Sequence, residues 1–249
     1  MRTSNPVLRA DTFDQARAPF AAEGERMTLQ GTVNKSALLL ALLMLSAFYV
    51  WRRFAGSEAP QGLYPWMMAG MLGGLVMALV TTFKKEWSPL TAPLYALLEG
   101  LAIGGISLLF EARFPGVVLQ AVGLTFGTFA ALLVIYKSRL VRVTDNFRLG
   151  VAAATGGIFL IYLLTWILGF FHIQVPYLHQ GGLIGIGFSL FVLVVAALNL
   201  VLDFDFIEAG AARGAPKYFE WYAGFGLLVT LVWLYVEFLR LLGKLRERR

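Results

Sequence analysis

Long apolar runs separated by short polar segments occupy most of this 249-residue chain. A bilayer core about 30 Å thick needs about 20 apolar helical residues to cross it. Because lipid offers no partner for backbone N–H and C=O groups, each run must form a helix. The pattern therefore predicts an all-α polytopic membrane protein, a bundle of seven transmembrane helices. The runs cover residues 36–51 (extended through Phe54), 63–83, 90–110, 117–136, 149–171, 183–202 and 219–242.

Three parts follow from this pattern: a polar tail over residues 1–35, the helix bundle over 36–242, and a basic tail over 243–249. The first tail lacks the apolar stretch of a signal peptide, so the first span is expected to act as an uncleaved insertion signal. Lys and Arg in the central loops favour a cytoplasmic N-terminus. The basic C-terminal residues oppose this orientation, because seven complete spans place the two ends on opposite sides.

Composition excludes several classes of function. The chain is 58% hydrophobic and 14% charged, and it has no cysteine, so it can form neither a disulfide nor a thiolate metal site. Its net charge of +6 does not indicate nucleic-acid binding, because the basic residues lie in loops and tails. His172 and His179 lack the spacing of a helical zinc site. We expect neither enzymatic activity nor a cofactor, and the alternative of an intramembrane hydrolase lacks a catalytic constellation.

Glycines recur inside the predicted spans at the spacing that lets helix backbones approach closely. Gly70 with Gly74 and Gly100 with Gly104 are each four residues apart. Such pairs predict close packing within one bundle, in preference to a role in dimerisation or ligand binding. The oligomeric state stays open.

Glu99 is the clearest charged residue inside a predicted span. Counted from the start of its helix, it lies about 14 Å deep, near the middle of the bilayer. Because a charge at that depth is costly, Glu99 must be protonated, paired or directed into a polar cavity. The sequence leaves open whether it serves function or donates one structural hydrogen bond between helices.

A second polar group lies at the inner end of the sixth run. Asn199 and Asp203 are one helical turn apart, so they share one face of the predicted helix. This favours a functional role for Asp203. Asp205 points elsewhere, and both Asp205 and Glu208 are expected to lie at the solvated helix end.

Glu220 opens the seventh run on the same membrane side as Asp203. It is the carboxylate of that run expected at equal depth, since Glu237 is about 25 Å further along the helix. Two carboxylates that meet at this depth share a proton. After deprotonation, Asp203 and Glu220 could bind Ca²⁺ through their oxygens.

Several segments in this order resemble a known family. They are Asn5-Pro-Val-Leu8, Gly31-Thr-Val-Asn-Lys35, Ser88-Pro-Leu-Thr-Ala, Leu202-Asp203-Phe-Asp205-Phe-Ile-Glu208 and Ala215-Pro-Lys-Tyr-Phe-Glu220-Trp-Tyr. Over essentially the whole chain, they resemble the transmembrane Bax inhibitor motif family in its bacterial YccA-like branch. The resemblance implies a bundle with a central last helix, located in the bacterial inner membrane.

The resemblance also implies a pH-sensitive calcium leak that an aspartate pair on the last two helices controls. Asp203 matches the first aspartate of that pair, whereas Thr230 stands where the second is expected. A hydroxyl cannot form a carboxylate pair, so Glu220 or Glu99 would have to take its place. The basic latch of the family finds only Lys84 or Lys85 as a match.

Two functions from different classes therefore remain. The first is a Ca²⁺ leak that responds to protonation of Asp203 and an acidic partner. The alternative is an interaction protein without transport, which modulates a membrane protease or a stress response. In that case the polar tail 1–35 and the basic segment 240–249 would serve as docking segments.

Overall fold

The computed structural model describes residues 26–56, 62–141, 143–171 and 182–248, and seven of the helices in these ranges are long and apolar enough to cross a membrane. The prediction of an all-α membrane protein with seven spanning helices is confirmed. The histidine-bearing loop and the polar N-terminal tail up to residue 25 lie outside the described residues.

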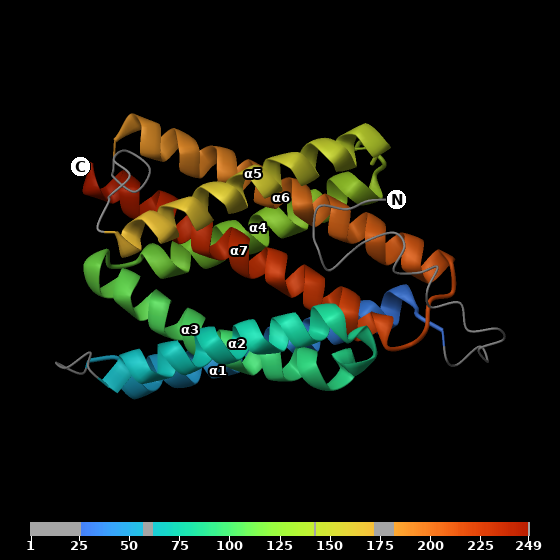
Figure 1. Ribbon diagram of the computed structural model, residues 1–249, viewed down its shortest axis with the longest axis horizontal. Helices are drawn as coiled ribbons and strands as arrows, with labels where there is room; N and C mark the ends of the chain where they lie inside the picture. The colour runs from blue at the N-terminus through green and yellow to red at the C-terminus, as the bar shows by residue number, and fades with distance from the viewer. Residues whose placement is uncertain (1–25, 57–61, 142, 172–181, 249) are drawn as a thin grey trace. The chain divides into compact units, whose positions relative to one another are not determined.

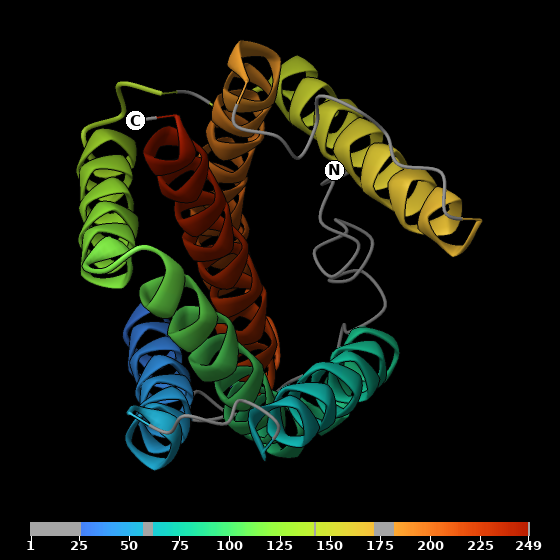
Figure 2. The ribbon, with the colours of Figure 1, turned by 90° about the vertical axis from the view of Figure 1, so that its left-hand side faces the viewer.

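The chain divides into two compact units, which are described separately. The first, called the α1–α3 unit, contains α1 (Leu29–Phe54), α2 (Leu63–Phe83), the short helix η4 (Lys85–Trp87) and α3 (Ser88–Arg113). It also includes residues 205–229, which form the end of α6 and the beginning of α7. Within this unit, α3 packs against both α1 and α2, as Figures 1 and 2 show.

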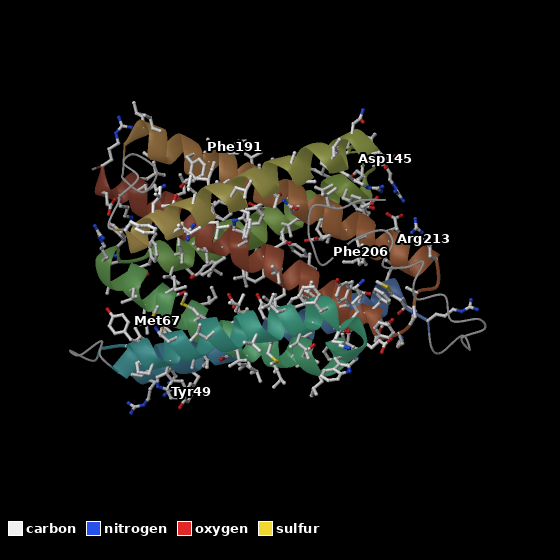
Figure 3. The ribbon with its side chains drawn as sticks, in the orientation of Figure 1. Tyr49, Met67, Asp145, Phe191, Phe206 and Arg213 are labelled. Carbon is white, nitrogen blue, oxygen red and sulfur yellow. The ribbon has the colours of Figure 1, made fainter. Side chains whose placement is uncertain are left out.

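The second, called the α4–α6 unit, contains α4 (Val117–Lys137), α5 (Asp145–Phe170) and most of α6 (Leu183–Ala212). The part of α7 (Phe219–Glu247) from residue 230 onward completes it. Thr144 caps α5 by accepting a hydrogen bond from the backbone N–H of Phe147 at 3.2 Å. Asp145, labelled in Figure 3, lies in the first turn of α5 and pairs with Arg148 at 3.2 Å.

Glycine packing is confirmed for the helices of the α1–α3 unit. A Cβ added to Gly70 of α2 would lie 2.6 Å from the backbone nitrogen of Ala102 in α3. One added to Gly104 of α3 would lie 2.6 Å from the carbonyl oxygen of Ala47 in α1. These distances are far inside van der Waals contact, so only glycine permits these two helix contacts.

Most of the helices extend beyond their predicted ranges, α1 and α6 by the most. α1 begins at Leu29 rather than at residue 36, because Thr28 caps it by accepting a hydrogen bond from the N–H of Gly31 at 2.9 Å. α6 continues past residue 202 to Ala212, and the chain then turns at Gly214, which has a φ of 63°. After this turn, the carbonyl oxygen of Ala215 accepts a hydrogen bond at 2.6 Å from the N–H of Met27, which lies just before the cap of α1.

Candidate functional site: buried polar side chains of the last helices

Asn199 and Asp203 form a buried polar face on α6 in the α4–α6 unit. The side chains are buried, with 3% of Asn199 and 1% of Asp203 exposed. The Asn199 amide donates to Thr155 Oγ1 of α5 at 2.8 Å and to the carbonyl oxygen of Val195 at 2.9 Å. This fixes the amide group, and its neighbour Asp203 brings a carboxylate onto the same face one turn away.

Thr230 belongs to the same unit and is also buried. It lies on α7, where the resemblance predicts an acidic residue. The predicted ion-binding residues in this unit therefore offer one carboxylate (Asp203), one amide (Asn199) and one hydroxyl (Thr230), rather than a pair of carboxylates. Asp205, by contrast, is half-buried and falls in the α1–α3 unit.

Glu220 is fixed at the beginning of α1 rather than presented as a vacant ligand. Its Oε1 accepts hydrogen bonds from the backbone N–H of Thr28 at 3.0 Å and from Thr28 Oγ1 at 2.9 Å. The Lys217 ammonium lies 2.8 Å from the same oxygen. The side chain is 1% exposed, and the carboxylate lies so close to Gly31 that an added Cβ would overlap it. A negative charge at the positive end of a helix is stabilising.

Glu99 lies half-buried on α3 and faces α2. Its Oε2 would be 2.9 Å from a Cβ added to Gly74, so this glycine makes room for the carboxyl group. Both Glu99 and Glu220 belong to the α1–α3 unit, whereas Asp203 belongs to the other. The pairing of Asp203 with either glutamate stays a prediction.

The two latch candidates also lie in the α1–α3 unit. Lys84 is exposed, and its backbone N–H closes the end of α2 by donating to Val80 O at 2.7 Å. The Lys85 ammonium lies 5.9 Å from the ring centre of Tyr222, in the first turn of α7. Lys35 is placed in the same way, 4.8 Å from the ring centre of Trp221.

A second group of buried charges lies toward the end of α7, and its connections were not foreseen from the sequence. Glu237 is 0% exposed, and its Oε2 accepts from Tyr162 Oη at 3.3 Å and from Arg240 at 3.5 Å. The Lys244 ammonium donates to Gly185 O at 3.0 Å and to Ser189 Oγ at 2.8 Å. The spacing of Glu237 and Arg240 is a sequence signal for an ion pair on one helix.

These arrangements indicate what the chemistry can be. No cluster of three or more acidic, histidine or cysteine side chains that could hold a metal ion occurs in the described ranges. Carboxylates such as Asp203 and Glu237, buried on membrane-spanning helices, suit the reversible binding of one passing cation.

The sequence model of a protein family described as Bax inhibitor 1 like matches residues 5–247, which is nearly the whole chain. No curated protein matches the sequence.

Proposed function

The chain belongs to the Bax inhibitor 1 like family, and from this premise we propose that it is a cation leak, with Ca²⁺ as the main permeant ion, controlled by protonation of Asp203. The observation that carries the proposal is the burial of Asp203, 1% exposed, inside a membrane-spanning helix beside Asn199. A carboxylate at such a position is costly to place in a membrane and usually marks an ion or proton pathway.

The polar face of α6 is better suited to conducting Ca²⁺ than to binding it tightly. Calcium takes about six to eight oxygen ligands when it is bound tightly. Asp203, Asn199 and the hydroxyls of half-buried Thr155 and buried Thr230 would supply fewer, so Ca²⁺ would bind weakly and leave quickly. Weak binding is what conduction requires.

Thr230 gives this leak a distinct pH response. In a pair of interacting carboxylates the protons leave in two coupled steps. With a hydroxyl at Thr230, position 230 of α7 contributes no second proton, so the leak should depend less steeply on pH than one with carboxylates at both 203 and 230.

The proposal also includes a location in a bacterial inner membrane, with the N-terminus in the cytoplasm. It further includes Lys84 or Lys85 as the latch residue.

The test uses purified protein in liposomes that contain a calcium indicator. The initial rate of Ca²⁺ entry should exceed that of empty vesicles and should vary with pH. Asp203→Asn, which keeps the shape but cannot titrate, should remove the variation. Asp205→Asn is the matched control, since this half-buried neighbour should leave the pH response intact.

A rate equal to that of empty vesicles at every pH would reject the leak. It would favour the alternative of an interaction protein that modulates a membrane protease or a stress response, which crosslinking in cells would then address. A rate that varies with pH equally in the wild type and in Asp203→Asn would reject the role of Asp203 alone.

A further inference from the structure

Glu237 is a buried carboxylate with unused capacity to accept a hydrogen bond or a cation. Its Oε2 contacts Tyr162 and Arg240, whereas its Oε1 is buried and has no hydrogen-bond partner in the described part of the chain. A buried acceptor left without a partner costs about 1–3 kcal/mol, and more when it is charged. Such a group is retained at a cost, which is a reason to look for a ligand.

The position of Glu237 relates it to the polar face of α6 within one unit. Thr230 and Glu237 are seven residues apart on α7, so they share one helix face two turns apart. Trp233 lies between them in the sequence and packs against a buried apolar cluster made of Ile158, Val192 and Val195. Asn199, one turn from Val195 on α6, lies at one side of this cluster.

The same apolar cluster therefore separates two polar levels of the α4–α6 unit. One level contains Asn199 with its bond to Thr155 of α5. The other contains Glu237 with its bond to Tyr162, two turns further along α5. A path that follows α5, α6 and α7 would meet a carboxylate on either side of an apolar layer: Asp203 before it and Glu237 after it.

The cations around Glu237 differ in how firmly they are held. Lys244 is 8% exposed and donates to two neutral acceptors, Gly185 O and Ser189 Oγ. Arg240 is 43% exposed at its side chain, and its Nη1 lies 3.5 Å from Glu237 Oε2. It also lies over the Tyr162 ring, 5.2 Å from the ring centre. The Arg240 guanidinium thus makes one long contact with a carboxylate that is itself 0% exposed, while part of the arginine side chain stays uncovered.

We propose that Glu237 is a second cation-binding site of this protein, with Arg240 as a built-in competitor that occupies the carboxylate when no metal cation is bound. The inference rests on the proposed leak and adds a site to it. A cation arriving at Glu237 displaces the guanidinium group, which turns toward solvent and remains hydrated. The carboxylate then receives the cation with the Tyr162 hydroxyl oxygen beside it.

Two substitutions should change the leak in opposite directions. Glu237→Gln removes the charge that receives the cation, and the rate of Ca²⁺ entry into liposomes should fall by about tenfold, equivalent to about 1.4 kcal/mol. Arg240→Gln removes the competitor, and the rate should rise by about two- to fivefold, equivalent to about 0.4–1 kcal/mol. Arg246→Gln is the control, because Arg246 bonds to Pro115 O instead and should leave the rate unchanged.

The outcomes separate this inference from the proposed leak. Opposite changes in the two variants, each with a wild-type melting profile in detergent, support it. If Glu237→Gln fails to fold, Arg240→Gln still decides the matter, since an unchanged or lower rate contradicts competition. If the wild type leaks and Asp203→Asn loses its pH response while both Glu237 and Arg240 variants behave as wild type, only the second site is overturned. If the wild type does not leak, both proposals fail.

Discussion

Gly31→Ala is the most informative single substitution for the structure of the α1–α3 unit. The added Cβ would overlap the carboxylate group of Glu220, all three of whose terminal atoms lie against Gly31. The carboxylate would have to leave the beginning of α1 and lose both hydrogen bonds from Thr28. Hydrogen bonds to a charged group contribute about 1.5–3 kcal/mol each. With partial rehydration of the displaced group, we expect a loss of about 2–4 kcal/mol in the free energy of unfolding.

The assay is thermal unfolding of the purified protein in detergent. For a chain of this size, 1 kcal/mol corresponds to about 2–4 °C in Tm, so Gly31→Ala should lower Tm by about 4–16 °C. The matched control is Gly127→Ala in α4, where an added Cβ would have nothing within 4 Å. That change should leave Tm unchanged or raise it, because alanine is favoured over glycine in a helix by about 0.5–1 kcal/mol.

A double-mutant cycle tests the cause. In a Glu220→Ala background the carboxylate is gone, and Gly31→Ala should then cost almost nothing. If Gly31→Ala melts like the wild type, or if its cost is the same in both backgrounds, Glu220 does not lie over the first turn of α1 and the reasoning is wrong.

Three further predictions follow from single contacts. Gly104→Ala should lower Tm more than Gly105→Ala, since the first Cβ would meet the Ala47 backbone whereas the second would meet the flexible Met67 side chain, labelled in Figure 3. Lys217→Met should reduce the unfolding free energy by at most about 1 kcal/mol, measured by the same melts, because the lysine side chain is 51% exposed. Thr230→Asp should make Ca²⁺ entry depend more steeply on pH, since a second buried carboxylate in the unit of Asp203 would couple two protons; an unchanged slope would show that the two positions do not interact.

The class of the protein could be read from the sequence because it depends on local physics. A run of about 20 apolar residues has one stable form in lipid, and each of the predicted runs is a helix in the structure. The helix ends were harder to place. The beginning of α1 depends on Thr28 and on a carboxylate from Glu220, 192 residues away, which no local pattern contains.

The charged groups show the same division. Residue counting placed these groups along their helices, and Asp203, Glu220 and Glu237 are all buried within the protein. Their partners are tertiary contacts and could not be counted in this way. Glu220 appeared from the sequence to be a candidate ligand, yet it is bonded to Thr28 and Lys217. Glu237 was set aside because of its depth, although Tyr162 of α5 meets it.

The most direct test of the central claim is the pH dependence of Ca²⁺ entry into liposomes that contain either the wild-type protein or Asp203→Asn. The account predicts a rate that changes from acidic to neutral pH in the wild type and a flat profile in the variant. Identical profiles for the two proteins, or entry no faster than in protein-free vesicles, would contradict it.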